Sequence, residues 1–418
     1  MSQIKHSLQH IINALKNGVV PQYGVEYLCV GRDKQLQEII RGFNLIKENS
    51  GVVKIVSGEY GSGKTFFLQR MKLEALRNNF IVSSIKINQG FRLNHLQHLY
   101  YNIMHNLSIL EDSEMDTSFE DIFDKWITKL QDMPSNMASA EIEKILHALE
   151  KYNASFSRAI TSYIRARINN DKELSATIAS WLTGEENIPY HLKAKFDVIG
   201  KVDKINALDF LKAFIKLAKI VGYNGIVILV DELELVMNER VDIRCKAYEN
   251  IRYIIDECTI GELNHIMFVF TATNDLLSDS EKGIMSYEAL YQRLGNPVDK
   301  NNSALSDMRQ PILRLPRLSD EDFMKITTNM YEIYKEVYNI KPSISIESIM
   351  NWALYMYKEV EPDMKEINLR KFVMKVIEVF DIIEQHPDNT LLKSELKKTE
   401  KNGAIVFKAQ FKKSETVI

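Results

Sequence analysis

The amino-acid sequence predicts an α/β fold built on a parallel sheet, with a long helical stretch inside it and another after it. Short runs at 52–57, rich in β-branched residues, and at 225–230 and 266–272, continuously apolar, have the pattern of buried strands. A glycine-rich loop directly follows the first run, and amphipathic stretches lie between the runs. This alternation is typical of an α/β domain with helices packed on its sheet.

The composition is that of an ordinary globular protein. The chain has 418 residues, which predicts two or three structural units. No apolar run approaches the roughly 20 residues needed to cross a bilayer, and the N-terminus lacks the pattern of a signal peptide. Three cysteines without a CxxC pair predict neither a disulfide framework nor a zinc site. We therefore expect a cytoplasmic protein with no membrane partner.

The expected elements follow in order along the chain. Proline and glycine residues separate the helical patterns, and β-branched residues mark the strands. The predicted strands are 52–57, 80–87, 225–230, 266–272 and 312–315. The predicted helices are 4–16, one whose apolar residues are Leu36, Ile39, Ile40 and Phe43, and then 66–78, 93–110, 119–131, 140–168, 172–182, 207–221, 320–338, 344–357 and 369–384.

The glycine-rich loop carries the strongest chemical signal. Gly58-x4-Gly63-Lys64-Thr65 has the spacing of a phosphate-binding loop, and it lies between a strand and a helix as that motif requires. Glycines let backbone N–H groups approach phosphate oxygens, and the following helix directs its positive end at them. Lys64 can reach the β- and γ-phosphates, and the Thr65 hydroxyl can bind Mg²⁺. ATP and Mg²⁺ are the expected cofactors, and the expected contacts are Gly58, Glu59, Tyr60, Gly61, Ser62, Gly63, Lys64, Thr65 and Phe66.

A second strand ends in the acidic pair Asp231-Glu232. Asp231 is predicted to bind Mg²⁺ and Glu232 to polarise the attacking water. An acid pair at this place favours the ATPase class with a strand inserted between the two motifs, and 266–272 fits that strand. Asn274 follows it, either as the residue that holds the water or as a turn cap.

These motifs together resemble an AAA+ ATPase. Val30-Gly31-Arg32-Asp33 with Leu36 is similar to the box that precedes the phosphate loop in the origin-recognition and signalling branches. More narrowly, 18–21, 58–68 and 80–87 resemble the ATP-binding proteins of BREX-type bacteriophage-defence systems. The resemblance covers about 15–100 in sequence and 224–316 in pattern.

The resemblance implies a homo-oligomeric ring or arc with ATP between subunits. A neighbouring subunit would then supply an arginine to the transferred phosphoryl group. We prefer Arg293 for this role, and Arg309 competes with it. Arg370 is placed like the arginine that reports the γ-phosphate to a helical lid, although Leu369 stands where a small residue or proline often precedes it. The resemblance also places adenine near Val20, Tyr23 and Val30.

We expect five segments. About a hundred of the residues between the two motifs are more than a minimal core needs. Arg158 and Arg165 share one helix face there, which either contacts phosphates or a partner or faces solvent. The segments are 1–26, an N-terminal helix and adenine-side linker; 27–90 with 222–315, the ATPase core; 91–221, a helical insertion; 316–386, a helical lid; and 387–418, a basic tail.

The basic tail bears on the choice of partner. Seven lysines and two glutamates lie between 393 and 413, and 404–411 can form a small hairpin. Such a tail either lies on the phosphate backbone of DNA or is a solvated C-terminus.

Two functions remain open. The first is an oligomeric ATP-hydrolysing motor or switch that acts with DNA and with partner proteins of a bacteriophage-defence system. The second is a nucleotide-gated scaffold that assembles partner proteins through the helical insertion and hydrolyses ATP slowly. A signalling ATPase is a weaker third, because no effector domain is visible in the chain.

Overall fold

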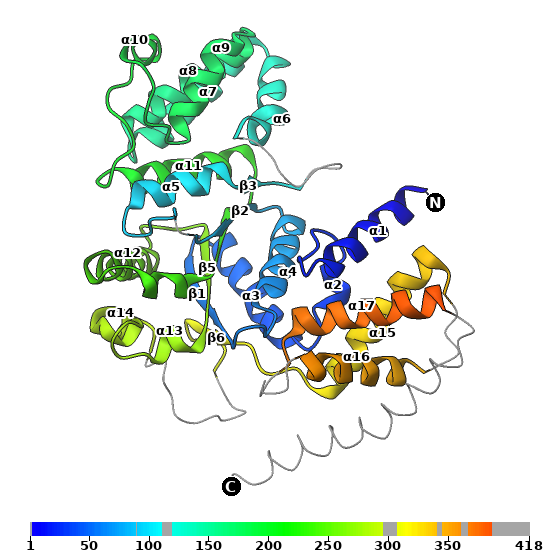
Figure 1. Ribbon diagram of the computed structural model, residues 1–418. Coiled ribbons are helices and arrows are strands. Elements are labelled where there is room, and N and C mark those ends of the chain that lie inside the picture. Colours follow the sequence, from blue (N-terminus) through cyan, green and yellow to red (C-terminus); the bar gives the residue numbers. More distant parts are fainter. Residues whose placement is uncertain are drawn as a thin grey trace. The chain divides into compact units, whose positions relative to one another are not determined.

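The computed structural model describes residues 2–88, 90–110, 119–295, 307–340, 345–360 and 367–386. It is a mixed α/β structure with a six-stranded, mostly parallel sheet, which confirms the α/β part of the predicted fold class (Figure 1). The predicted basic tail and its hairpin at 404–411 lie outside the described residues. In the part of the chain that is described, no helix is long and apolar enough to cross a bilayer.

The sheet is parallel except at one edge. Its order is β3-β2-β4-β5-β1-β6, and only the short β3 runs antiparallel to its neighbour. As predicted, β5 lies between β1 and β4, and every residue of β4 and β5 is buried. The strands are β1 (Gly51–Ser57), β2 (Ile81–Lys86), β3 (Leu107–Ser108), β4 (Ile226–Asp231), β5 (Ile266–Ala272) and β6 (Ile312–Arg314).

Helices occupy most of the remaining described chain. The α-helices are α1 (Ser2–Lys16), α2 (Val25–Leu28), α3 (Asp33–Lys47), α4 (Lys64–Arg77), α5 (Leu96–His105), α6 (Phe119–Gln131), α7 (Ser135–Glu150), α8 (Ala154–Ile168), α9 (Lys172–Leu182), α10 (Tyr190–Lys193), α11 (Ala207–Val221), α12 (Val241–Ile260), α13 (Asn274–Ser278), α14 (Glu288–Arg293), α15 (Asp320–Tyr338), α16 (Ile346–Val360) and α17 (Leu369–Gln385). Three short 3-10 helices are η1 (Ala194–Phe196), η2 (Leu233–Asn238) and η3 (Ile284–Ser286).

Two predicted helices differ from the structure, and one long helix was not predicted. The helix predicted at 93–110 is shorter, since α5 ends at His105 and β3 follows it. The helix predicted at 140–168 is two helices, because Asn153 starts the second by accepting a hydrogen bond from the backbone of Phe156 at 2.9 Å. The long helix α12 was not predicted at all.

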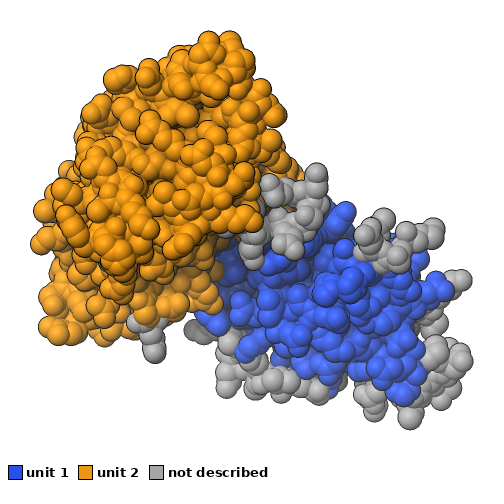
Figure 2. Space-filling view, turned by 90° about the horizontal axis from the view of Figure 1, so that it is seen from above, with its two compact units in different colours: residues 1–34, 58–70, 315–418 blue, residues 35–57, 71–314 orange. Residues whose placement is uncertain are grey.

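The described chain forms two compact units, coloured in Figure 2. The first comprises residues up to 34, the segment 58–70 and the helices from α15 onward. The second comprises 35–57 and 71–314, and it contains the whole sheet.

The helices between β2 and β4 share one hydrophobic core with the sheet. Phe210 and Phe214 of α11 are fully buried and lie in the same cluster as Ile228 of β4. Phe210 makes edge-on ring contacts with Tyr100 and Phe156, each of which adds about 0.5–1.5 kcal/mol beyond its buried area. These helices therefore pack together with the sheet inside the second unit.

The first unit has its own packing. Ser319 caps α15: its hydroxyl accepts from the backbone of Asp322, whose carboxylate accepts from the backbone of Ser319. Phe323 of α15 and Phe372 of α17 pack edge-on at 4.9 Å, and α1 packs against both helices.

A buried lysine fixes the segment before β6. Lys54 of β1 lies 2.8 Å from Glu38, and its ammonium also donates to the carbonyls of Met308, Arg309 and Gln310 at 2.9–3.0 Å. Burial raises the pKa of Glu38, but hydrogen bonds from Arg41 and Lys54 outweigh it, so the pKa lies below the usual glutamate value. The stability that this carboxylate contributes is therefore present above the unfolded pKa and is lost as the pH falls through the folded one.

Replacing Lys54 by methionine is expected to destabilise the protein by about 3–5 kcal/mol, because Glu38 keeps its buried charge and three carbonyls lose their donor. Chemical denaturation of the full chain measures the change. Lys144→Met is the matched control, since its pair with Glu141 is exposed and worth about 0–1 kcal/mol. An equal, small effect of both substitutions would contradict the structural role of Lys54.

Candidate functional site: a phosphate loop and an acidic strand end

The glycine-rich loop connects β1 to α4. Ser57 ends β1, Gly58 begins the loop, and Lys64 is already the first residue of α4. Gly61 and Gly63 have φ values of 83° and 90°, a left-handed conformation that side chains disfavour. The loop thus brings backbone N–H groups and a helix N-terminus together, an arrangement that binds anions.

Residues of its own unit hold this loop from outside. The backbone N–H of Leu369 donates to the carbonyl of Gly61 at 3.0 Å, and a Cβ at Gly61 would lie only 2.4 Å from the Asn368 amide nitrogen. Arg32 donates to the carbonyls of Ser62 and Pro316, and its side chain is buried. The conformation of the loop is therefore tied to the start of α17 and to the segment before α15.

The groups inside the loop fit a phosphate. Lys64 is 8% exposed, and its ammonium donates to the carbonyls of Gly58 and Glu59 at 2.9 and 3.1 Å. The Ser62 hydroxyl is buried and has no hydrogen-bond partner among the described residues. A triphosphate would offer hydrogen-bond acceptors to both groups. The first turn of α4 has no acidic residue that would repel it.

The acidic pair ends β4 in a strained turn. Asp231 is 7% exposed and accepts a hydrogen bond from the Thr271 hydroxyl of β5. Glu232 has a φ of 64°, which costs a non-glycine residue about 1 kcal/mol or more. Its backbone N–H donates to Asp231 Oδ1 at 3.1 Å and to Thr271 Oγ1 at 3.0 Å, and these bonds hold the turn.

Lys86 pairs with the second acid. Its ammonium lies 3.0 Å from Glu232 Oε1, and the two side chains are 66% and 36% exposed. Lys86 is the last residue of β2, and the strand register sets it opposite Asp231. The carboxylate of Glu232 is thus held at the solvent-facing carboxyl edge of the sheet.

Asn274 contacts the end of the loop strand. It is the first residue of α13, and its Oδ1 accepts from the Ser57 hydroxyl at 2.7 Å. The cap position of α13 belongs to Thr273, which makes no side-chain cap bond. This contact agrees better with a residue that faces the loop strand than with a turn cap.

The three predicted arginines lie in different settings. Arg293 ends α14, and its guanidinium pairs with Asp256 at 3.0 Å. Arg309 is exposed, on the segment whose carbonyls Lys54 holds. Arg370 is exposed near the start of α17, and its side-chain carbons would lie 3.4 Å from a Cβ at Gly18.

The remaining predicted positions differ in exposure. Tyr60 in the loop is 76% exposed, whereas Phe66 is buried. Of the three residues predicted near adenine, Val30 is buried, Val20 is half-buried and Tyr23 is exposed.

The insertion arginines mostly serve the fold. Arg158 pairs with Asp197, and Arg167 pairs with Asp124, whereas Arg165 is exposed. This supports the solvated or structural alternative for that helix face.

Sequence reasoning missed three residues of this site: Ser57, Lys86 and Asn368. Each has a weak signal in hindsight, because Ser57 and Lys86 are polar residues that end otherwise apolar strands and Asn368 precedes an amphipathic helix. Their partners are set by strand order and by helix packing, which the local sequence does not contain.

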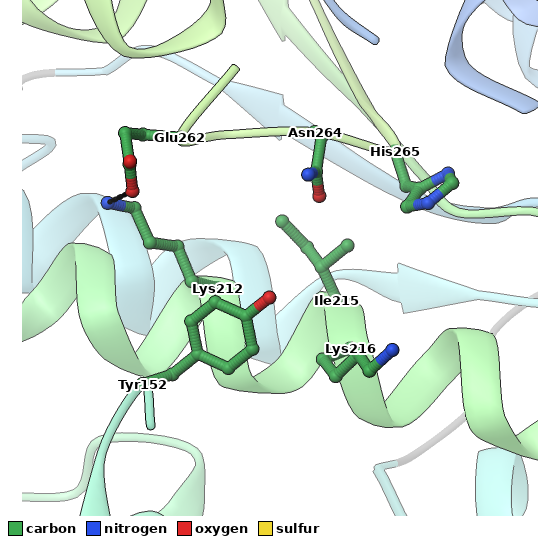
Figure 3. A pocket seen from close by; sticks show the side chains of 7 residues that line it. All are labelled: Tyr152, Lys212, Ile215, Lys216, Glu262, Asn264 and His265. Carbon is green, nitrogen blue, oxygen red and sulfur yellow. Dashed lines mark ion pairs between the residues drawn. The ribbon is translucent and has the colours of Figure 1, made fainter. Parts of the chain in front are cut away.

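A small cavity near the amino-terminal end of β5 is not a nucleotide site. Its volume is about 20 Å³, room for roughly one water molecule. Figure 3 shows Lys212 paired with Glu262 at one side of it, with Tyr152 near Lys212 and His265 at the other side.

Comparison with known proteins gives one finding. The family model described as BREX system ATP-binding protein BrxC/D matches residues 4–399, nearly the whole chain. Among curated proteins, none matches the sequence.

Proposed function

The chain belongs to the BREX system ATP-binding protein BrxC/D family, which gives it an ATP-binding role in phage defence, and on this premise we propose that it is an AAA+ ATPase. It hydrolyses Mg²⁺-bound ATP as a homo-oligomeric motor or switch that acts with DNA and with partner proteins of the defence system. One observation carries this proposal: β5 lies between β1 and β4, and through it Asn274 contacts Ser57 and Thr271 contacts Asp231.

Binding is assigned to the loop. Backbone N–H groups of 58–66 and the ammonium of Lys64 hold the phosphates, and Lys64 exchanges its two carbonyl partners for phosphate oxygens. The Thr65 hydroxyl and the Asp231 carboxylate supply oxygen ligands of the kind that Mg²⁺ prefers. When bound, the ion neutralises charge that develops on the phosphates.

Hydrolysis is assigned to the acidic strand end. Glu232 accepts a proton from the attacking water, since its side chain is 36% exposed whereas Asp231 is buried. Asn274 orients that water through its amide, with Ser57 fixing the amide plane. Arg370 reports the loss of the γ-phosphate to the helices that begin with α15, which form the lid.

We propose roles for the segments with the boundaries expected from the sequence. The core of 27–90 and 222–315 performs catalysis, the linker of 1–26 borders adenine, and the insertion of 91–221 meets partners. The lid of 316–386 closes on nucleotide, and the tail of 387–418 contacts DNA.

A nucleotide-gated scaffold is the alternative, and one surface favours it. In the insertion Tyr190, Ile199 and Ile205 are 75%, 81% and 81% exposed, although such side chains are usually buried. A protein partner would cover them.

The two functions are separated by ATP turnover of the full chain. The motor predicts turnover that requires Mg²⁺, rises several-fold with DNA, and accompanies oligomers formed with a non-hydrolysable ATP analogue. Lys64→Ala should abolish binding and turnover, whereas Lys125→Ala, at an insertion lysine, should change neither. Slow turnover that DNA leaves unchanged would support the scaffold instead.

A further inference from the structure

A large cavity lies outside the loop just described. Its volume is about 530 Å³, within the range of small-molecule sites. Residues after β2, residues of η2 after β4, and the start of α12 line it. It is therefore at the carboxyl ends of β2 and β4, whereas the phosphate loop follows β1 on the other side of β5.

Part of the lining of the cavity is apolar. Phe91 and Val236 are 7% and 4% exposed, and Leu235 and Ile243 continue the wall. Such a surface accepts a flat ring by stacking and van der Waals contact.

Other lining residues carry amide groups. Asn88, Asn94 and Asn238 line the cavity, and the Oδ1 atom of Asn94 is buried with no hydrogen-bond partner among the described residues. An unpaired buried oxygen is costly, and a ligand N–H group would satisfy it. Side-chain amides pair with the hydrogen-bonding edges of nucleobases.

The rim favours an anion. Arg92 is exposed at the cavity, where it can meet a phosphate, and His95 lies near it. Glu239 on the η2 side is the acidic group, and it can accept from an exocyclic amine.

Two hydrogen bonds hold the walls in place. Asn250 of α12 donates to the carbonyl of Leu93 at 2.9 Å, and the buried Arg244 donates to the carbonyl of Glu239 at 3.1 Å. These bonds tie α12 to the segment after β2 and to Glu239, so they connect the parts of the chain that line the cavity.

The cavity also touches the acidic pair. The backbone N–H of Ile87, a lining residue, donates to the carbonyl of Asp231 at 3.1 Å. Lys86, one residue earlier, pairs with Glu232, and η2 starts one residue after Glu232. A ligand that shifts Ile87 or η2 therefore acts on Glu232.

We propose that this cavity binds a nucleobase, from an unpaired nucleic-acid strand or from a free nucleotide, and that its occupancy adjusts Glu232. The apolar lining residues stack on the ring, Asn94 accepts a hydrogen bond from its N–H edge, and Arg92 holds the adjoining phosphate. The effect on Glu232 rests on the hydrolysis proposed above, while the binding itself does not.

Fluorescence anisotropy of a labelled strand of about 12 nucleotides tests the binding. The protein is the full chain with Lys64→Ala, so that the phosphate loop does not contribute. We expect an abasic strand of the same length, and the same strand in duplex, to bind about tenfold more weakly. Equal binding of intact and abasic strands would overturn the proposal, and an apolar side chain of a protein partner would then be the occupant.

Variants separate the parts of the site. Asn94→Leu should remove the tenfold preference for bases, whereas Asn264→Leu, at the small cavity of Figure 3, should keep it. Arg92→Ala should weaken intact and abasic strands alike, and because Arg92 is exposed, this variant reports on the cavity even if Asn94→Leu does not fold. A preference that survives Asn94→Leu in folded protein would overturn the assignment.

Two further measurements identify the source and the effect. Adenosine monophosphate that displaces the strand at micromolar concentration indicates a free nucleotide as ligand, and its failure to displace indicates a strand. In protein with an intact loop, the ligand should change ATP turnover several-fold, and Asn94→Leu should remove that change. If turnover is absent with or without ligand, the hydrolysis proposal fails while base binding stands.

Discussion

Glu232→Gln is expected to lower the rate of ATP hydrolysis by about 10²–10⁴-fold while ATP still binds. Glutamine keeps the size of the side chain but cannot take a proton from water. The substitution leaves the sequence of the loop at 58–66 unchanged. Single-turnover hydrolysis and binding of a fluorescent ATP analogue measure the two quantities separately.

The control must remove a similar ion pair elsewhere. Lys86 and Glu232 lie 3.0 Å apart, and so do Lys201 and Glu186 on the insertion. Glu186→Gln should leave turnover unchanged. Unaltered turnover in Glu232→Gln would remove this residue from the chemistry, and loss of ATP binding would mean that its role is in the fold.

The strands of the sheet were predictable because burial on both faces leaves only apolar residues. β4 and β5 are buried at every position, and their sequences read as continuous apolar runs. The position of β5 between β1 and β4 was predicted from the acidic pair and not from the apolar pattern of β5 itself. The sequence therefore predicted the arrangement that matters most for the site.

Helix α12 was missed although its buried apolar residues recur at helical spacing. These residues are Ala247, Tyr248, Ile251, Ile254, Ile255 and Cys258. Arg244, Asn250 and Glu257 lie among them and are each less than 9% exposed. They bond the carbonyls of Glu239 and Leu93 and the ammonium of Lys212. Such buried polar residues interrupt the apolar pattern, which makes α12 harder to recognise in the sequence than β4 or β5.

The contacts of the site were beyond sequence reasoning for a related reason. The loop, the acidic pair and Asn274 were each recognised from their own residues. Their partners come from neighbouring strands, as when Lys86 of β2 meets Glu232 after β4. Such a pairing depends on the strand register, because a shift of one residue would turn each side chain of the strand to the other face of the sheet.

Arg309→Ala is expected to lower ATP turnover on the order of 10³-fold, because a neighbour's arginine stabilises the transferred phosphoryl group. The sequence favoured Arg293 for this role. In the structure Arg293 pairs with Asp256, which Arg252 also contacts at 2.7 Å, so using it would break an existing ion pair. Arg309 is exposed on backbone that Lys54 holds by three carbonyls, a rigid support for a residue that must reach outward.

Mixing variants tests whether the arginine acts on the neighbouring subunit. A subunit with Glu232→Gln keeps Arg309, and a subunit with Arg309→Ala keeps Glu232. Equal mixtures of these two inactive variants should recover part of the turnover, because some interfaces then combine an intact glutamate with an intact arginine. Arg293→Ala should retain turnover alone. If Arg293→Ala is inactive and is rescued by Glu232→Gln while Arg309→Ala stays active, the assignment returns to Arg293. Recovery by neither pair would mean that each subunit hydrolyses ATP with its own residues, which removes the main reason for an oligomeric motor.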